Sequence, residues 1–223
     1  MQREFWIERW QQQQIGFHQS EINQYLQEYW QEVRQPYPES RVFVPLCGKS
    51  LDMLWLTQQG HDVIGIELSQ IAIDDFIAEN QLELATHHHP SMVEHRGEDL
   101  SLICGDFFDL EKDQLQDCHL VFDRASLIAL PPEMRPSYAA HLTDILPADV
   151  EMLLITLAYN EDEMNGPPFS VEDSEVQQLF AEQFSIKKIA EYDILKENPK
   201  FQSRGCQRLI ESVFILSRGR LGV

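Results

Sequence analysis

The chain has 223 residues, of which 43% are hydrophobic and 10% aromatic, so it can bury one sizeable core and lacks the composition of a disordered protein. Its 37 Asp and Glu outnumber its 17 Lys and Arg and give a formal net charge of −20. Because such a surface repels phosphate backbones and anionic lipids, we expect no nucleic acid and no membrane among the partners, and a cationic ligand would be favoured.

Two helical segments precede the first predicted strand. The apolar pattern predicts helices over Glu4–Gln14 and Glu21–Arg34, and two prolines separate them from that strand. The N-terminus mixes charged and aromatic residues and lacks the apolar stretch of a signal peptide, and no later apolar run is long enough to span a bilayer. We therefore expect a cytoplasmic protein of one domain, residues 1–223, in which residues 1–35 form a helical lid.

The middle of the chain alternates short apolar runs with stretches of helical periodicity. This pattern is typical of βαβ units, whose parallel sheet is buried on both faces by helices. The predicted strands are Arg41–Pro45, Asp62–Glu67, Leu102–Cys104, His119–Phe122 and Met152–Leu157. The predicted helices are Leu51–Gln59, Gln70–Asn80, Lys112–Leu115 and Glu133–Ile145. The fold class is therefore α/β, with a mostly parallel sheet and helices on both faces.

The last part of the chain has a different pattern. A helix is predicted from Val171 to Glu182, with Ser170 as its N-cap in a capping box. Two extended runs come after it, Ile186–Ile194 and Leu209–Leu216, joined by a polar loop. Because no crossover helix connects them, they must pair antiparallel, and the sheet is expected to finish with a hairpin.

Cysteines and histidines give little support for a metal centre. The four cysteines lie far apart without a CxxC pair, which favours reduced thiols over disulfides or zinc; they are Cys47, Cys104, Cys118 and Cys206. The tract His87–His89 is followed by Pro90 and, nearby, by His95. Three consecutive side chains cannot all face one ion from a strand or a helix, so we interpret the tract as a solvated loop, with metal binding as the alternative.

The chemistry of an open parallel sheet is expected at the carboxyl ends of its strands. The first strand runs into a turn at Gly48, where the backbone can approach a ligand closely. The second strand ends at Glu67, about 20 residues later, where an acidic residue can bind ribose hydroxyls. Together the two positions indicate an adenosine-containing ligand.

The same residues do not match two known phosphate-binding motifs. The sequence Gly48-Lys49-Ser50 matches the end of a P-loop motif. The motif also requires a glycine five residues before Gly48, and that position is Phe43. A nicotinamide-type GxGxxG is also missing, because only one glycine occupies the turn. A turn without a phosphate cradle suits a cofactor without phosphates, and S-adenosylmethionine is one.

Further strand ends supply more candidates. Asp106 follows the third strand, where it could accept a hydrogen bond from an adenine amino group while Phe107 packs on the ring. Asp123 and Arg124 end the next strand. This pair has two interpretations, a structural salt bridge or a direct role for Arg124 in the chemistry.

Aromatic side chains form a stripe on the first predicted helix. Trp6 and Trp10 lie four residues apart on one face, with Ile7 beside them and Phe17 beyond the helix. The stripe can be a face that docks onto a core. It can also belong to a lid that places an indole over a sulfonium cation, an interaction worth up to about 2 kcal/mol when desolvated.

With these residues identified, the sequence resembles the thiopurine S-methyltransferase family, particularly its bacterial members. The similarity extends over nearly the whole chain, and the matching segments are Phe5–Trp10, Gly16–Gln19, Val44–Ser50, Asp123–Ala125 and Gly166–Phe169. The turn from Pro45 to Lys49 is the most specific element, because methyltransferases in general have a glycine-richer loop there.

The resemblance implies a seven-stranded, Rossmann-like methyltransferase sheet with S-adenosylmethionine as methyl donor. By motif, the implied cofactor contacts beside Gly48 are Trp6 or Trp10, Leu46, Glu67, Asp106, Phe107 and Arg124. Phe17 is implied at the substrate. Family members also use an arginine near the C-terminal hairpin, for which Arg204 is the candidate, although the loop Lys196–Arg204 departs from the mammalian pattern.

The implied reaction is an in-line SN2 transfer of a methyl group to the sulfur of an aromatic, thiopurine-like thiol. Such a thiol is acidic and soft, so the protein must chiefly supply alignment, which can contribute roughly 7–11 kcal/mol. Arg124 is the expected catalytic residue, because a cation placed in advance stabilises negative charge that develops on the heterocycle.

Two alternatives stay open. The acceptor could be a selenium or tellurium species, since these are also soft nucleophiles, or the chain could bind S-adenosylmethionine without catalysis. We expect a monomer, because no long exposed apolar stripe is left once the sheet and the lid are assigned.

Overall fold

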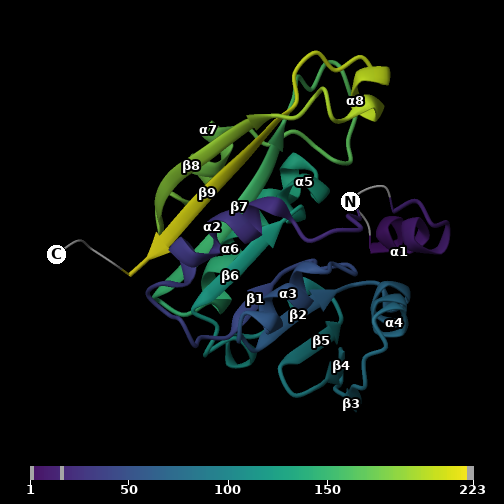
Figure 1. Ribbon diagram of the computed structural model, residues 1–223, viewed down its shortest axis with the longest axis vertical. Coiled ribbons are helices and arrows are strands. Elements are labelled where there is room, and N and C mark those ends of the chain that lie inside the picture. Colours follow the sequence, from purple (N-terminus) through teal and green to yellow (C-terminus); the bar gives the residue numbers. More distant parts are fainter. Residues whose placement is uncertain (1–2, 16–17, 220–223) are drawn as a thin grey trace. The chain divides into compact units, whose positions relative to one another are not determined.

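The structure is a computed structural model that describes residues 3–15 and 18–219 (Figure 1). The chain divides into two compact units, which are described separately. The N-terminal unit contains the chain up to Phe122 together with Ile145–Pro147, and the C-terminal unit contains Asp123–Asp144 and the chain from Ala148 onward. The expectation of one domain over residues 1–223 stays a prediction.

Four parallel strands form the centre of the N-terminal unit. They are β1 (Val42–Val44), β2 (Val63–Glu67), β5 (Leu100–Cys104) and β6 (Leu120–Arg124), the last of which runs on into the C-terminal unit. Val42 pairs with Val63 on one side and Leu120 on the other. Every residue of β1 and β2 is buried, which explains their continuous apolar sequence. All four strands were predicted.

The helices of the N-terminal unit connect these strands or precede them. They are α1 (Arg3–Gln11), α2 (Gln24–Arg34), α3 (Asp52–Gln58), α4 (Gln70–Glu79) and the short 3-10 helices η1 (Phe107–Asp109) and η2 (Lys112–Gln114). Asn23 caps α2 by accepting from two backbone N–H groups, and its own N–H donates to the buried Asp52 carboxylate at 2.7 Å. The start of α2 is thereby tied to the start of α3.

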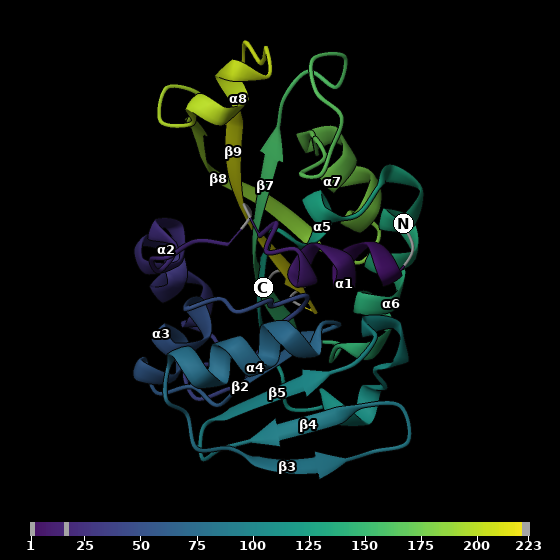
Figure 2. The same ribbon diagram turned by 90° about the vertical axis from the view of Figure 1, so that its right-hand side faces the viewer.

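A hairpin of two polar strands extends the sheet of the N-terminal unit at one edge. Strands β3 (Ala85–His88) and β4 (Val93–Arg96) pair antiparallel, and β4 pairs antiparallel with β5 (Figure 2). The strand order in this unit is β3-β4-β5-β2-β1-β6. The predicted solvated loop is therefore wrong for His87 and His88, which lie in an exposed edge strand. Among the described residues, no cluster of histidines, cysteines and carboxylates could hold a metal ion.

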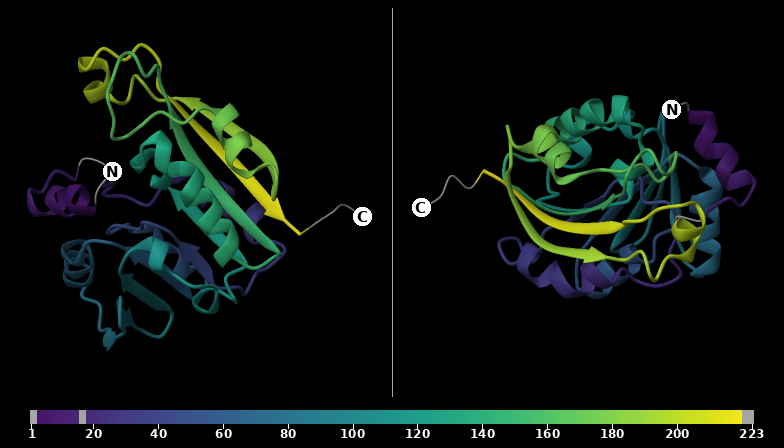
Figure 3. Two further views of the ribbon diagram at one scale, coloured as in Figure 1. Left: turned by 180° about the vertical axis from the view of Figure 1, so that it is seen from behind. Right: turned by 90° about the horizontal axis from the view of Figure 1, so that it is seen from above.

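Three long antiparallel strands form the sheet of the C-terminal unit (Figure 3). They are β7 (Val150–Ala158), β8 (Ser185–Asp193) and β9 (Ile210–Arg218), in the order β7-β9-β8. The hairpin of β8 and β9 was predicted. The helical segments of the unit are α5 (Ser126–Ala129), η3 (Pro132–Met134), α6 (Arg135–Ile145), α7 (Asp173–Phe180) and α8 (Pro199–Ser203).

The predicted α/β class is confirmed, with nine strands in the described chain rather than seven. The additional pair is β3 and β4. The predicted cap of α7 is wrong: Glu172 is the N-cap, and the Ser170 hydroxyl instead bonds to both the N–H and the carbonyl of Tyr159. The four cysteines are free thiols. None of the helices in the described chain is both long and apolar enough to cross a membrane.

A buried indole–imidazole pair attaches α2 to the start of β2. Trp30 donates from Nε1 to Nε2 of His61 at 3.1 Å, and Nδ1 of His61 lies 2.9 Å from the Ser40 carbonyl. A carbonyl can only accept, so Nδ1 carries the hydrogen and the ring is neutral. Burial lowers the pKa of His61 below its ordinary value of 6.5, and Arg34 lowers it further, while the Ser40 carbonyl raises it.

We expect acid to loosen this attachment. Since the pKa of His61 is depressed in the folded state, its contribution to stability is complete above the unfolded value of 6.5 and is lost as the pH falls through the folded value. Urea unfolding across that range should show a steeper loss for the wild type than for Trp30→Phe, which no longer opposes a proton on Nε2. At neutral pH the variant should be less stable by more than the roughly 1 kcal/mol of the lost hydrogen bond, because Trp30 is fully buried and the smaller side chain also leaves a cavity. Parallel pH profiles for the two proteins would contradict this.

Candidate functional site

The turn between β1 and α3 has an unusual backbone. Leu46 and Gly48 both have positive φ, 44° and 54°, and the Cys47 N–H between them donates to the Ile66 carbonyl at 2.9 Å. Glycine adopts this conformation without a steric penalty, whereas a side chain such as that of Leu46 adopts it at a cost of roughly 1–2 kcal/mol. The turn is thus bent sharply at the predicted ligand position and is linked to the end of β2.

Glu67 joins two turns through its carboxylate. Its Oε2 accepts from the Gly48 N–H at 3.0 Å, and its Oε1 accepts from the Ser69 N–H at 2.8 Å. Only 7% of the residue is exposed. Burial raises the pKa of Glu67, and these N–H donors partly offset that rise. A carboxylate has about four acceptor positions, so it can still accept from ligand hydroxyls.

Ser69 adds a feature that the sequence did not predict. It is the N-cap of α4, yet its side chain makes no capping hydrogen bond. Among the described residues, its buried hydroxyl has no hydrogen-bond partner. An unpaired buried hydroxyl is unfavourable by about 1–3 kcal/mol, so a polar ligand beside Glu67 would be stabilised there. The signal in the sequence was a serine two residues after the strand-end acid, just before a helix.

Lys49 is paired with acidic side chains of α4. Its ammonium is 2.6 Å from Glu79 Oε1 and 3.9 Å from Asp75 Oδ2, both on α4, and the side chain is 8% exposed. A P-loop lysine must instead reach the phosphates of its ligand. The structure therefore agrees with the sequence argument against a P-loop.

Asp106 and Phe107 follow β5, as predicted. Asp106 caps η1 by accepting from the Phe108 N–H, and its Oδ2 lies 3.4 Å from Arg3 Nε of α1. Phe107 is 3% exposed and packs edge-on against Phe108. A role of either residue in binding adenine stays a prediction.

The two tryptophans of the stripe have different surroundings in the structure. Trp10 is buried, and its indole covers the turn so closely that a Cβ added to Gly48 would lie 3.4 Å from Trp10 Cζ2. Trp6 is half-buried and packs edge-on against Phe5. Helix α1 also contacts α4 (Figure 2). The docked-face interpretation thus describes Trp10, and the lid role stays a prediction. Phe17 lies outside the described residues.

The Asp123–Arg124 pair lies at the end of β6. The Asp123 carboxylate is fully buried and accepts from the Tyr138 hydroxyl at 2.8 Å. Arg124 is half-buried. The next residue, Ala125, has a left-handed φ of 69° and is the N-cap of α5. Tyr138 was missed because it lies 15 residues from Asp123 on a helix whose sequence shows no polar motif.

Arg204 lies in the same unit as Arg124. It is exposed at the end of α8, and its Nη1 is 3.4 Å from Met164 Sδ. Met164 belongs to a small buried apolar cluster against which Ile128 of α5 packs. The structure therefore connects Arg204, through this cluster, with the helix that follows Arg124.

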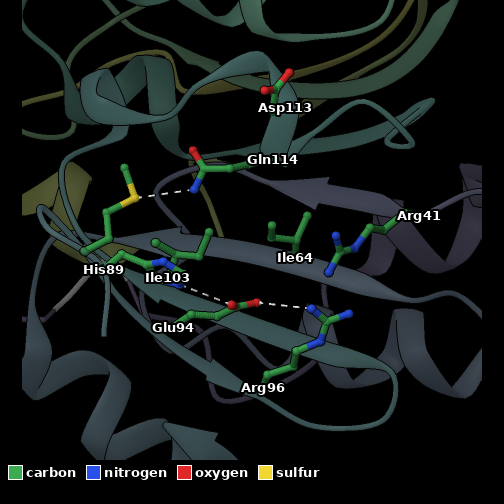
Figure 4. Close-up of a pocket in the computed structure, with 9 residues that line it drawn as sticks. Arg41, Ile64, His89, Glu94, Arg96, Ile103, Asp113 and Gln114 are labelled. Carbon is green, nitrogen blue, oxygen red and sulfur yellow. Dashed lines mark hydrogen bonds and ion pairs between the residues drawn. The ribbon is translucent and has the colours of Figure 1, made fainter. Parts of the chain in front are cut away.

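A cavity of about 230 Å³ lies elsewhere in the N-terminal unit (Figure 4). Ile64, Met92 and Ile103 line it, and Glu94 lies between His89 at 3.6 Å and Arg96 at 4.0 Å. It shares no residue with the predicted cofactor contacts. Within its lining, Glu94 is the partner of both His89 and Arg96, while Arg41 pairs with Asp62 outside it.

The residues at the strand ends fit an adenosine cofactor without phosphates. Glu67 supplies a carboxylate with spare acceptor capacity, and Ser69 supplies an unpaired hydroxyl beside it. At Gly48 the turn carries no side chain that would keep a ligand from the backbone. The only lysine of the turn is held by α4. Together they provide groups for a ribose and none for a pyrophosphate.

Sequence comparisons give a consistent family. The family described as thiopurine S-methyltransferase matches residues 1–219. The thiopurine S-methyltransferase of Nitrosospira multiformis is 50% identical over 216 residues, covering 97% of this chain and 98% of that protein. The enzyme of the same name from Marinobacter nauticus is 48% identical over 217 residues, covering 97% and 99%.

Solved structures share the fold at low sequence identity. A phosphoethanolamine N-methyltransferase of Haemonchus contortus, in complex with S-adenosylhomocysteine, superposes with a TM-score of 0.60 and 8% identity over 87% of this chain and 52% of that one. The YcgJ protein of Bacillus subtilis gives 0.60 and 11% over 86% and 99%. The fold is thus that of class I S-adenosylmethionine-dependent methyltransferases.

We expect Glu67→Gln to destabilise the N-terminal unit. An amide offers only one oxygen, so its NH₂ would face either the Gly48 or the Ser69 N–H and leave that donor unpaired, with a loss of about 1–3 kcal/mol. Chemical denaturation measures the loss, and Glu83→Gln at an exposed position is the control. Equal stabilities of the two variants would show that the carboxylate does not hold the turns.

Proposed function

Because the chain belongs to the thiopurine S-methyltransferase family, we propose that it transfers a methyl group from S-adenosylmethionine to the sulfur of aromatic or heterocyclic thiols. Relatives of that name cover nearly its whole length at about half identity. The observation that carries the proposal is the Glu67 carboxylate, which lies at the end of β2 beside an unpaired hydroxyl and a turn without a phosphate cradle.

Cofactor binding is assigned to the N-terminal unit. Bound S-adenosylmethionine supplies a methyl group on a sulfonium, which a soft nucleophile attacks in line. Glu67 and Ser69 would hold the ribose, and the backbone around Leu46 and Gly48 would accept the rest of the cofactor closely. Asp106 and Phe107 are proposed for the adenine, and Trp6 or Trp10 for the sulfonium, because an indole face stabilises a cation.

Acceptor binding is assigned to Arg124, Arg204 and Phe17. Arg124 is the proposed catalytic residue, because its guanidinium would stabilise negative charge on the heterocycle as the thiol loses its proton. Arg204 would reach the acceptor from the end of α8, and Phe17 would stack on an aromatic ring. These groups bind and orient, and alignment of two reactants is the main contribution that such a reaction requires.

The cellular setting follows from charge and thiols. A net charge of −20 favours a small-molecule acceptor over nucleic acid. The four free thiols suit a reducing compartment, so we place the protein in the cytoplasm. We propose that it acts there as a monomer that detoxifies foreign thiols and, by the same chemistry, selenium or tellurium species.

We expect the purified protein to convert an aromatic thiol panel, which includes a mercaptopurine, into products heavier by one methyl group. Mass spectrometry with S-adenosylmethionine as the second substrate measures the products. Arg124→Ala should lower kcat/KM for the thiol by roughly 10²-fold, as expected for loss of one charge-stabilising donor.

Other outcomes of this assay would each replace the proposal. Products only from reduced selenium or tellurium compounds would make metalloids the acceptors. Calorimetric binding of S-adenosylmethionine without turnover on any acceptor would indicate a binding module. Absence of binding at millimolar cofactor would remove the assignment of the strand ends altogether.

Gly48 and Gly60 provide a matched pair for the cofactor position. Both have positive φ, 54° and 89°, so alanine at either should destabilise the fold by about 1 kcal/mol. Only Gly48→Ala adds a methyl group in the proposed site, and we expect it to weaken calorimetric binding of S-adenosylhomocysteine by at least about tenfold. Equal affinities of the two variants would place the cofactor away from this turn.

A further inference from the structure

We propose that Asp123 is a positioning residue for Arg124: its buried carboxylate, held by Tyr138, maintains the turn from which the guanidinium reaches the acceptor. The inference rests on the proposed function only in giving Arg124 contact with the acceptor. All of its structural parts lie within the C-terminal unit, on β6, α5 and α6.

Burial makes Asp123 unusual. Its exposed fraction is 0%, and the Tyr138 hydroxyl donates to Oδ2 at 2.8 Å. Its other oxygen, Oδ1, is buried and forms no hydrogen bond within the described chain. A buried carboxylate is strongly unfavourable unless several donors surround it. A buried carboxylate at the end of β6 therefore constrains the turn that follows it.

The attached element is a strained turn. Ala125 has a φ of 69°, a conformation that is unfavourable for alanine by roughly 1–2 kcal/mol, and no side chain caps α5 there. Ser126, the first residue of α5, is fully buried and directs both its hydroxyl and its N–H toward the Asp123 carboxylate. The carboxylate thus closes a loop across Arg124 and Ala125, which compensates the strain and sets the direction of the Arg124 side chain.

The carboxylate should therefore be sensitive to protonation. Burial raises the pKa of Asp123 to about 6, while the hydroxyls of Tyr138 on α6 and Ser126 on α5, with the Ser126 N–H, lower it. Arg135, the arginine of α6, is directed elsewhere: its Nε donates to the Leu127 and Leu130 carbonyls and its Nη1 pairs with Glu175. A proton on Oδ1 would weaken the interactions by which the Asp123 carboxylate stabilises the turn at Ala125.

The test is the acid limb of the pH profile of kcat/KM for an aromatic thiol. Tyr138→Phe removes a donor that favours the charged carboxylate, so the midpoint should move upward by about one pH unit. Asp123→Asn should abolish this limb and lower kcat about tenfold at neutral pH. The thiol titrates identically in every protein, so only enzyme groups can separate the profiles.

Tyr159→Phe is the matched control. It also removes the hydroxyl of a buried tyrosine of the same unit, one that donates to the Pro168 carbonyl at 2.7 Å, and should leave the midpoint in place. A merely structural role for Tyr138 would lower the melting temperature of both variants without moving either midpoint. Unchanged midpoints in Tyr138→Phe would therefore overturn the inference.

A second readout separates this inference from the proposed function. The ¹³C NMR titration of the Asp123 carboxyl, assigned through Asp123→Asn, requires no turnover and should give an inflection near pH 6 that moves upward in Tyr138→Phe. If the wild-type protein shows this titration but methylates no thiol, the proposed acceptor is wrong and the interaction of Asp123 with Tyr138 still stands. An inflection near pH 4 in both proteins would overturn the inference about Asp123 and would leave the proposed methyl transfer unaffected.

Discussion

The buried carboxylate of Glu67 is the constraint on which the N-terminal site depends. One oxygen accepts from the turn after β1 and the other from the start of α4, so a single side chain sets the spacing of two neighbouring strand ends. Both donors are backbone N–H groups, whose positions are determined by the sheet. Because β1 and β2 are buried on both faces and paired in parallel register, the carboxylate is carried by the most rigid part of the unit.

The strands and the strand-end positions could be predicted because one rule governs them. Continuous apolar runs give buried parallel strands, and the carboxyl ends of such strands carry the ligand-binding residues. Gly48 and Glu67 were predicted in this way, without any side-chain contact being known, and their role in ligand binding stays a prediction. Arg204 rested on resemblance alone, and the structure adds its contact with Met164. Trp10 had two interpretations, and its burial over Gly48 favours packing.

The remaining features depend on partners that are distant in the chain. Strand β3 is the edge strand of the sheet and all of its residues are exposed, so the apolar signal of a strand is missing from His87 and His88. Ser170 has the pattern of a helix cap, but its hydroxyl finds both partners in Tyr159 at the end of β7, and this tertiary pair replaces the local one. Tyr138 donates to Asp123 only because α6 packs back against β6, and no sequence motif predicts this contact.

Glu67 and Asp123 solve the same physical problem in two ways. Each is a buried carboxylate at the end of a strand, and in each case burial raises the pKa while N–H or hydroxyl donors, rather than a paired cation, lower it. For Glu67 the donors are backbone N–H groups, those of Ser69, Gly48 and Leu68, whose positions are set by the main chain. For Asp123 a principal donor is the hydroxyl of Tyr138, and one oxygen is left unpaired within the described chain. The first arrangement suits a residue that must bind, and the second suits a residue whose hold on its neighbour depends on its charge.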